Sequence, residues 1–535
     1  MSSTPASVVC TDLSFAWPDG TPVFVDFSVT VGTGRTGLVG VNGSGKSTLL
    51  RLMAGLLKPA GGSVKVAGEL GYLPQNVTLD PDVQVEQTLG IAEVRSALNA
   101  IEAGDTSEEL FTAVGDDWDA EERARAALDR LGLAHVTLDR QIGDLSGGES
   151  VLLSLAAQFL RRPDVLLLDE PTNNLDLEAR RRLYEAVGAW KGSMVIVSHD
   201  RELLDLVDRI ADLRAGRVCW YGGNFSDYEE ALAVEQEAAG RMVRVAESDV
   251  RQQKRELADA RIKLDRRIRY GNKMHDTKRE PKVIMNERKR QAQVAAGKHR
   301  TMHLERLEGA RERLSDAEEA VREDKEIRVD LPETSVPASR TVLTLREVEL
   351  RYGTRADLEI RGPERIALVG RNGSGKSTLL RTIVGEIPPV AGDVRTGAPL
   401  RYLPQRLDLL DDGLTVAQNI GSFAPGATDN AIRARLARFL FRGRRADQLV
   451  GMLSGGERFR ATLAALLLAE PAPQLLLLDE PTNNLDLASV RQLSQALHSY
   501  QGALLVVSHD LAFLRDIGIT RWIRMDGTTT QIDPL

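Results

Sequence analysis

The 535-residue sequence has few cysteines, no long apolar run and no apolar leader. Its two cysteines, Cys10 and Cys219, lie far apart, so we expect no disulfide framework and a reducing cytosol as the simplest compartment. No apolar run reaches the roughly 18 residues of a membrane-spanning helix. The first residues, MSSTPASVVCTDLSFAW, lack a basic segment followed by an apolar one, so a signal peptide is not expected either.

Composition and length place the chain among soluble proteins with more than one domain. Apolar residues make up 42% and charged residues 27%, which is typical of globular proteins. A chain of 535 residues is too long for one hydrophobic core. The net charge of −8 argues against nucleic-acid binding by the whole surface, although an average can hide a basic patch.

The sequence contains one module twice. Five segments of the first copy return in the second in the same order. They are GLVGVNGSGKSTLLR (37–51 and, as ALVGRNGSGKSTLLR, 367–381), YLPQ (72–75 and 402–405), LSGGE (145–149 and 453–457), LLLDEPTNNLDL (166–177 and 476–487) and VSHD (197–200 and 507–510).

The spacing of the repeated segments locates an insertion in the first copy. Lys46 and Lys376 are 330 residues apart, whereas Ser146 and Ser454 are 308 apart. The first copy therefore holds 22 additional residues (330 − 308) between YLPQ and LSGGE. We expect a small helical insertion within about 83–119, where EVRSALNAIEAG and TSEELFTAV have helical patterns.

Both copies predict an α/β fold. Apolar strands such as VLLLDE and MVIVSHD alternate with helical segments, which indicates a mainly parallel sheet. We therefore expect two tandem α/β domains, at 1–230 and 341–535, joined by a linker at 231–340.

The linker is charged and carries two helical stripes. Small and apolar residues recur every three or four positions from Val243 to Leu264 and again from Leu307 to Val321, which predicts a long antiparallel helical hairpin. We place its break near Tyr270 to Pro281, because Gly271 and Pro281 disfavour helix. The segment VDLPETSVPAS at 329–339 is expected to be an extended exit into the second copy.

Two glycine loops carry the nucleotide chemistry. GVNGSGKST (40–48) and GRNGSGKST (370–378) have the spacing that lets backbone N–H groups surround phosphate oxygens at a helix N-terminus. Lys46 and Lys376 are expected to reach the β- and γ-phosphates, and Ser47 and Ser377 to hold Mg²⁺.

Acidic and polar residues follow the apolar strands of each copy. Asp169 and Asp479 end strands and are candidate Mg²⁺ ligands. Glu170 and Glu480 come next and can orient or deprotonate the attacking water. Further candidates in the reaction are His199 and His509, near the γ-phosphate, and Gln75 and Gln405, which could couple metal and water to a moving segment.

This set of glycine loop, glutamine, LSGGE, Asp-Glu and histidine resembles the ABC ATPase family across nearly all of both copies. The resemblance implies head-to-tail pairing within one chain, so that each ATP lies between one glycine loop and the opposite LSGGE. It also implies that adenine stacks on Trp17 and Tyr352. The implied ATP contacts are Trp17, Gly40, Asn42, Gly43, Gly45, Lys46, Ser47, Thr48, Tyr352, Gly370, Asn372, Gly373, Gly375, Lys376, Ser377 and Thr378, with Ser146, Gly147, Gly148, Ser454, Gly455 and Gly456 from the two LSGGE segments.

Within that family, two ATPase domains in one chain with a charged helical linker are similar to the ABC-F class. The class implies a cytoplasmic, monomeric partner of the 70S ribosome that enters the tRNA exit site, with its linker toward the peptidyl-site tRNA, the 23S rRNA and the peptidyl-transferase centre. Asn174 and Asn484 stand where many members have histidine. Ser150 begins a segment that lacks the basic residues Arg458 and Arg460 of the second copy, which makes the first LSGGE less standard.

Charge along the linker agrees with an RNA partner. Residues 251–300 contain 17 Lys and Arg and 6 Asp and Glu, a net charge of +11 (17 − 6), which leaves −19 for the rest (−8 − 11). Such a basic segment attracts RNA phosphates, although most charge runs are solvated helix faces. The candidate RNA contacts are Arg266, Arg267, Arg269, Lys273, Lys278, Arg279, Lys282, Arg288, Lys289 and Arg290.

Three functions remain open at this stage. A ribosome-acting ATPase is favoured, either as an antibiotic-resistance protein that protects the ribosome or as a housekeeping translation factor, with the short insertion favouring resistance by analogy. An ATP-binding subunit of a membrane exporter is disfavoured by the charged linker, and we expect no transmembrane partner. A chromosome-organising or repair ATPase would need longer coiled coils or zinc-binding cysteines.

Overall fold

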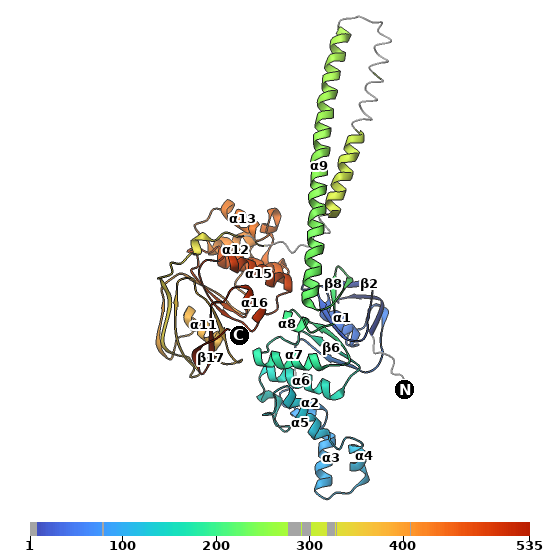
Figure 1. Ribbon diagram of the computed structural model, residues 1–535, viewed down its shortest axis with the longest axis vertical. Coiled ribbons are helices and arrows are strands. Elements are labelled where there is room, and N and C mark those ends of the chain that lie inside the picture. Colours follow the sequence, from blue (N-terminus) through green and yellow to red (C-terminus); the bar gives the residue numbers. More distant parts are fainter. Residues whose placement is uncertain are drawn as a thin grey trace. The chain divides into compact units, whose positions relative to one another are not determined.

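The computed structural model describes residues 8–77, 80–276, 290, 301–317, 327, 329–406 and 408–534. They form two compact units, one made of Met1–Asp227 with Glu326–Leu535 and one made of Tyr228–Lys325 (Figure 1). The first unit holds both sequence repeats, and the second is helical. The α/β fold class with two tandem domains and an intervening helical hairpin is confirmed.

The first repeat contains a six-stranded sheet in the order β5-β6-β7-β3-β8-β9 and a separate three-stranded antiparallel sheet in the order β2-β1-β4. In the six-stranded sheet only β9 runs antiparallel to its neighbour. Continuous apolar sequence makes β6 and β7 buried along their whole length, as expected for central parallel strands. The strands are β1 (Val8–Ala16), β2 (Pro22–Val31), β3 (Arg35–Val39), β4 (Gly61–Val66), β5 (Leu70–Leu73), β6 (Val165–Asp169), β7 (Ser193–Val197), β8 (Arg209–Arg214) and β9 (Arg217–Gly222).

The helices of the first repeat support the sheet edge where its functional residues lie. Helix α1 packs Leu49 and Leu50 against Val165 and Leu167 of β6, so the glycine loop before α1 is held on a buried core. The helices are α1 (Lys46–Met53), α2 (Val85–Leu89), α3 (Ala92–Glu102), α4 (Glu108–Val114), α5 (Ala120–Arg130), α6 (Gly147–Arg161), α7 (Leu177–Ala189) and α8 (Arg201–Leu204), with a 3-10 turn at Ile142–Asp144.

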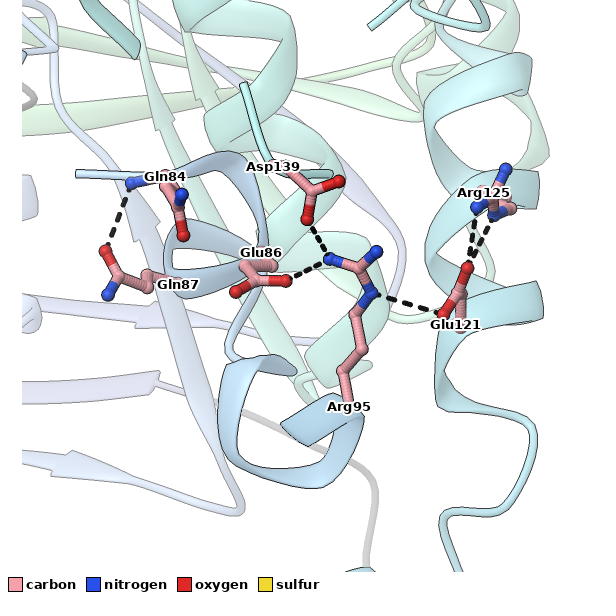
Figure 2. Close-up of polar contacts among 7 residues, drawn as sticks. All are labelled: Gln84, Glu86, Gln87, Arg95, Glu121, Arg125 and Asp139. Atoms are coloured by element: carbon pink, nitrogen blue, oxygen red, sulfur yellow. Dashed lines mark hydrogen bonds and ion pairs between the residues drawn. The ribbon is translucent and has the colours of Figure 1, made fainter. Parts of the chain in front are cut away.

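The insertion predicted within 83–119 is the helix pair α3 and α4. In Figure 2, Arg95 of α3 points its guanidinium toward carboxylates of three other segments: Glu86 of α2, Glu121 of α5 and Asp139 of a loop. The distances are 3.2 Å to Glu121 and 2.5 Å to Asp139. Since the Arg95 side chain is only 16% exposed, this network ties the inserted pair to the repeat's own helices.

The second repeat has the corresponding strands in one nine-stranded sheet ordered β13-β10-β11-β18-β17-β12-β16-β15-β14, and it lacks counterparts of the inserted helices α3 and α4 in its described residues. A single parallel bridge, Arg355 to Thr528, joins its antiparallel and parallel parts. The strands are β10 (Thr341–Glu349), β11 (Arg355–Arg361), β12 (Arg365–Val369), β13 (Ala391–Thr396), β14 (Leu400–Leu403), β15 (Leu475–Asp479), β16 (Ala503–Val507), β17 (Arg521–Asp526) and β18 (Thr528–Ile532). The helices are α11 (Lys376–Val384), α12 (Val416–Phe423), α13 (Asp429–Arg438), α14 (Gly455–Leu467), α15 (Leu487–Ser499) and α16 (Leu511–Asp516), with 3-10 turns at Gly443–Asp447 and Val450–Met452.

The segment before the second repeat belongs to that repeat's core. Val329 and Leu331 are buried in the same cluster as Tyr500, and Leu331 forms a parallel bridge with Tyr500. A 3-10 turn at Pro332–Thr334 follows. The expected extended exit is thus packed into the ATP-binding unit rather than into the hairpin, because its apolar side chains alternate toward the core.

The helical unit is a hairpin. Helix α9 (Phe225–Asp276) is 52 residues long, about 78 Å at 1.5 Å per residue. Figure 1 shows the helical segment 301–317 beside it. Val250 of α9 packs against Leu307 and Ala310 of this segment, and Arg313 binds Asp249 at 2.7 Å.

The helix break predicted from Tyr270 is wrong at its start. Helix α9 continues through Gly271 to Asp276. One glycine costs only about 1 kcal/mol in a helix interior, and the neighbouring Arg, Lys and Leu residues favour helix. The rest of the predicted break, up to Pro281, lies outside the described residues.

Candidate functional site

The first glycine loop connects β3 to α1 and closes on its own lysine. Gly45 has φ 99°, and a Cβ there would lie 2.9 Å from the ring of Phe24, so only glycine fits. Lys46 begins α1 and donates from Nζ to the carbonyls of Gly40 at 2.8 Å and Val41 at 3.2 Å. The N-terminal N–H groups of α1 therefore face the loop interior beside a buried ammonium, an arrangement suited to phosphate.

The second glycine loop has the same geometry. Lys376 begins α11 and donates from Nζ to the carbonyls of Gly370 at 2.7 Å and Arg371 at 2.9 Å. Gly375 has φ 98°, matching Gly45. Both predicted phosphate-binding loops are therefore formed in the same way, and neither differs in its lysine.

A hydroxyl and a carboxylate meet next to each lysine. The Ser47 hydroxyl donates to Asp169 Oδ1 at 2.9 Å, and the Ser377 hydroxyl donates to Asp479 Oδ1 at 3.1 Å. Oxygen pairs of this kind, completed by substrate phosphates and water, are what Mg²⁺ prefers. Burial raises the pKa of both aspartates, against which the serine hydrogen bonds act.

Two tyrosines complete these pairs, and the sequence reading assigned them no role. The Tyr72 hydroxyl lies 3.4 Å from Asp169 Oδ2, and the Tyr402 hydroxyl donates to Asp479 Oδ2 at 3.2 Å. They orient the carboxylate oxygen that does not contact the serine. Their recurrence in both YLPQ segments was the available signal.

The glutamates that follow have unusual backbone conformations. Glu170 has φ 49° and Glu480 has φ 46°, in the left-handed region that non-glycine residues rarely occupy. Their backbone N–H groups donate to Val197 of β7 at 2.8 Å and Val507 of β16 at 2.9 Å, which holds the turn in place. Such strain is often concentrated where a side chain must point into a reaction site.

Each glutamate faces the histidine of its own repeat. His199 Nε2 lies 3.3 Å from Glu170 Oε1, and His509 Nε2 lies 3.4 Å from Glu480 Oε1. Burial, followed by the charge of Lys46 or Lys376, lowers the pKa of both histidines to about 3, so the rings are neutral near pH 7 and the contacts are not ion pairs. Within the described part of the chain, neither ring nitrogen of His509 has a hydrogen-bond partner, nor has Nδ1 of His199. Buried polar atoms of this kind can form a hydrogen bond with a bound ligand.

Burial also dominates the ionisation of the glutamates. It raises the pKa of Glu480 to about 7, while the positive charges of Arg180 and Lys376 oppose the rise. Burial likewise raises the pKa of Glu170, with Lys46 as the opposing charge. A carboxyl whose pKa lies near neutrality is suited to accept a proton from water.

The raised pKa of Glu480 predicts a pH-dependent stability. Between pH 4.5, the ordinary pKa of this carboxyl, and about pH 7, Glu480 is protonated in a larger fraction of folded molecules than of unfolded ones. This applies to the protein without nucleotide or metal. The free energy of unfolding should therefore fall as pH rises through this window, by at most about 1.4 kcal/mol per pH unit for one proton.

Urea unfolding between pH 5 and 8 measures this effect as the difference between wild type and Glu480→Gln. The buried histidines act in the opposite direction in both proteins and cancel in the difference. A difference that does not change between pH 5 and 7 would contradict the raised pKa.

Residues after the two glutamates reach the opposite glycine loop. Asn42 donates from its backbone to Asp486 Oδ2 at 3.0 Å and from Nδ2 to the Asn484 carbonyl at 2.9 Å. In the other direction, Asn372 donates to Asp176 Oδ2 at 3.4 Å and to the Asn174 carbonyl at 2.6 Å. The sequence reading assigned no role to Asp176 or Asp486, although the repeated TNNLD run was the available signal.

The conformation of Asn174 and Asn484 explains the residue type there. Both have positive φ, 63° and 61°, which asparagine tolerates better than most residues. This conformation presents each carbonyl to the opposite asparagine. Asparagine at positions 174 and 484, where many members of the class have histidine, therefore suits the backbone conformation found there.

A cavity of about 400 Å³ opens beside the first glycine loop. Its size is typical of a small-molecule site. Residues of both repeats line it, among them Trp17, Lys46, Gln75, Glu170, His199, Asn484 and Leu485. Trp17 therefore stands where an adenine ring could stack. Its counterpart in the second repeat, Tyr352, is 82% exposed on a turn. Gln405, the counterpart of Gln75, is exposed on a bend.

The LSGGE serines cap helices. Ser146 caps α6 and Ser454 caps α14, each in a reciprocal hydrogen-bond pair with the glutamate three residues on, Glu149 and Glu457. Within the described residues, the hydrogen bonds that Ser146 and Ser454 make with these glutamates stay within their own repeat. A Cβ at Gly148 would lie 3.9 Å from Nδ2 of Asn372, so the first LSGGE approaches the opposite glycine loop.

The candidate RNA contacts are described only in part. Arg266 and Arg269 lie exposed on α9, and Arg290 is exposed in a helical position. The side chains of Arg267 and Lys273 are outside the described residues, as are Lys278, Arg279, Lys282, Arg288 and Lys289.

Among the helices of the described residues, none combines the length and the apolar character needed to cross a bilayer.

Comparisons with known proteins agree on the type of ATPase. The family model described as "ABC transporter" matches residues 24–173 and 354–483. The chain is 34% identical over 92% of its length to the tylosin resistance ATP-binding protein TlrC of Streptomyces fradiae, 92% of which is covered. It is 32% identical over 90% of its length to the energy-dependent translational throttle protein EttA of Mycobacterium tuberculosis, 84% of which is covered.

A solved structure of similar fold is the RNase-L inhibitor, with a TM-score of 0.59 and 21% identity over 98% of this chain and 90% of that one. At this identity the likeness supports the fold alone. The family model matches twice, and each match is accompanied by a lysine, serine, aspartate, glutamate and histidine in place. Together with relatives aligned over 90% or more of the chain, this shows that the chain belongs to the ABC transporter family, as an ATP-hydrolysing member of the ABC-F type.

Proposed function

We propose that this ATPase binds ribosomes in the cytoplasm and protects them from antibiotics, using Mg²⁺-dependent ATP hydrolysis to bind and leave. The observation that carries the proposal is the combination, in one chain, of two complete ATP sites with a helix α9 whose distal part is basic, residues 251–276 holding nine Lys and Arg against four Asp and Glu. The tylosin resistance relative, at 34% identity, favours protection over other ribosomal roles.

Each ATP site would work through its own residues. Lys46 or Lys376 would leave the loop carbonyls to bind the β- and γ-phosphates, and the α1 or α11 N-terminus would hold the remaining phosphate oxygens. Mg²⁺, when bound between Ser47 and Asp169 or between Ser377 and Asp479, would neutralise phosphate charge.

The glutamate and histidine of each site would act on the water and the γ-phosphate. Glu170 or Glu480 accepts a proton from the attacking water, for which a pKa near neutrality is suited. His199 or His509, neutral and unpaired on at least one nitrogen, would donate to a γ-phosphate oxygen. The LSGGE segments and the stacking residues Trp17 and Tyr352 are proposed to complete the two sites from either side.

Closure would follow from contacts between the two repeats of the one chain. Asn42 and Asn372 bind carbonyls and aspartates of the opposite TNNLD segment. Phosphate bound in either glycine loop would therefore act on the contacts between the two repeats. ATP would stabilise this paired state and hydrolysis would weaken it. We propose the three-part division into 1–230, 231–340 and 341–535, with the hairpin as the part that meets RNA, although the end of the middle part, residues 329–339, packs with the second repeat.

Contact of α9 with RNA phosphates predicts a salt-dependent loss of ribosome affinity. Arg266→Gln with Arg269→Gln should weaken binding to 70S ribosomes about tenfold and reduce the slope of log K against log salt by about 1.5, as expected for two phosphate contacts. Filter binding from 50 to 300 mM KCl measures both quantities, with ATP and with Glu170→Gln and Glu480→Gln also introduced to slow hydrolysis.

A matched control is Arg361→Gln with Arg395→Gln, which removes two exposed arginines of the second repeat. This pair should leave the slope unchanged. Equal effects of the two pairs would mean that net charge, rather than α9, determines ribosome affinity.

Expression in a sensitive bacterial host tests protection itself. The chain should raise the inhibitory concentration of drugs that bind the large-subunit tunnel or catalytic centre, and leave unrelated drugs unaffected. Unchanged inhibitory concentrations across those classes, with ribosome binding intact, would instead support a translation factor, the role named for the EttA relative.

A further inference from the structure

Arg180 is a buried arginine that lines the cavity beside the first glycine loop and whose positive charge also acts on Glu480 of the second ATP site. It lies one turn into α7, after the capping residue Asp176, and its side chain is 11% exposed. Its guanidinium donates to the Leu175 carbonyl at 3.3 Å through Nε, and Nη1 has two further acceptors. A buried guanidinium with such partners is costly to place and is fixed in direction.

The two acceptors of Nη1 come from different repeats. One is Asp200 Oδ2, at 3.3 Å, in the segment that follows His199. The other is the backbone carbonyl of His509, also at 3.3 Å, in the second repeat. Arg180 therefore reaches from the first repeat to the backbone of the histidine that faces Glu480.

The Asp200 carboxylate, which accepts a hydrogen bond from Arg180, is itself fixed by other groups. The Tyr184 hydroxyl donates to the same Asp200 Oδ2 at 2.6 Å, and Asp200 also caps α8 through the N–H of Leu203 at 3.1 Å. The carboxylate is thus shared among Tyr184, Arg180 and a helix cap. This leaves Nη1 directed at both Asp200 and the His509 carbonyl.

The mirrored position has no such donor. Asp176 and Asp486 cap equivalent helices at an offset of 310 (486 − 176), so Arg180 corresponds to Val490 and Tyr184 to Ser494. Val490 is 3% exposed and lines the cavity that also holds Glu170 and His199. A valine cannot donate to the His199 carbonyl, so the two sites differ at this point.

We infer that Arg180 of the first repeat is a positioning residue for the second ATP site, where it fixes His509 opposite Glu480, and that Val490, at the corresponding position beside the first ATP site, cannot act in the same way. The two sites are therefore unequal in hydrolysis. This inference rests on the proposed roles of Glu480 and His509. It matters most for His509 because neither of its ring nitrogens has a hydrogen-bond partner in the described chain, so the ring position depends on its backbone.

Three variants of the otherwise unchanged chain test the contact. Arg180→Val, which copies Val490, should lower kcat while KM for ATP stays within about twofold, since a displaced group costs turnover rather than binding. Arg180→Lys should recover at least half of the lost kcat. Tyr184→Phe removes a hydrogen bond to Asp200 without touching His509, and should leave kcat near wild type.

Two results would overturn the inference at this stage. One is an unchanged kcat in Arg180→Val. The other is an equal loss in Arg180→Val and Tyr184→Phe, which would place the effect at Asp200 and not at His509. Thermal melts show whether any loss follows from unfolding, in which case Arg180→Lys, with the charge retained, decides.

Site-resolved measurements separate this inference from the roles on which it rests. With Glu170→Gln, where only the second site turns over, Arg180→Val should lower kcat about tenfold. With Glu480→Gln it should change kcat less than twofold. Equal losses in both backgrounds contradict unequal sites. If Glu480→Gln itself does not lower the rate, the proposed role of Glu480 has failed; if it does and Arg180→Val has no effect, only the present inference has failed.

Discussion

Replacing Glu170 and Glu480 together by glutamine is expected to lower kcat for ATP at least about a hundredfold, the range for loss of a general base. Glutamine keeps the size and the backbone position set by Val197 and Val507 but cannot accept the proton. ATP affinity should stay within about threefold, because neither glutamate is placed to hold a phosphate. Phosphate release and fluorescent-nucleotide titration measure the two quantities.

Glu178→Gln is the control for this pair. Glu178 lies on α7 and is 64% exposed, so its loss should leave kcat unchanged. If the double variant keeps more than about a tenth of the wild-type rate, the glutamates are not the bases and another group must activate the water.

Replacing Lys46 and Lys376 by alanine is expected to weaken ATP binding at least about thirtyfold, since charge-assisted hydrogen bonds contribute about 1.5–3 kcal/mol each. Both ammonium groups are buried beside carboxylates and, within the described residues, donate to loop carbonyls. The loss should be larger for ATP than for ADP, because the lysines are placed for the β- and γ-phosphates. Titration of each single variant assigns the loss to a site.

Lys58→Ala is a suitable control because Lys58 is exposed and lies after α1, away from the loop. Lysine variants must also be shown to melt within a few degrees of wild type. Unchanged ATP affinity in a folded double variant would contradict the assignment of the glycine loops.

Much of the ATP chemistry could be predicted from the repeats. The sequence predicts which residues meet at the sheet edge from its two strands ending in Asp-Glu, two glycine loops and two strand-end histidines. In the structure, Ser47 contacts Asp169 and His199 lies beside Glu170. Parallel strands make this possible, because their carboxyl ends share one edge.

What the sequence could not show depends on contacts between distant segments. The contact of the Asn484 carbonyl with Asn42 exists only where the two repeats meet. The difference between Arg180 and Val490 is visible from the 310-residue offset, but its meaning requires the His509 carbonyl. The helix end was misplaced because Gly271 disfavours helix only slightly, and a long helix overrides it.

Ribosome pelleting with the Glu170→Gln, Glu480→Gln chain tests the central claim most directly. The chain is incubated with purified 70S ribosomes and ATP, ADP or no nucleotide, and centrifuged through a sucrose cushion. The account predicts that the variant pellets with ribosomes in ATP and stays in the supernatant otherwise, because bound ATP keeps the two repeats paired. Equal amounts in the pellet with and without ATP would contradict it.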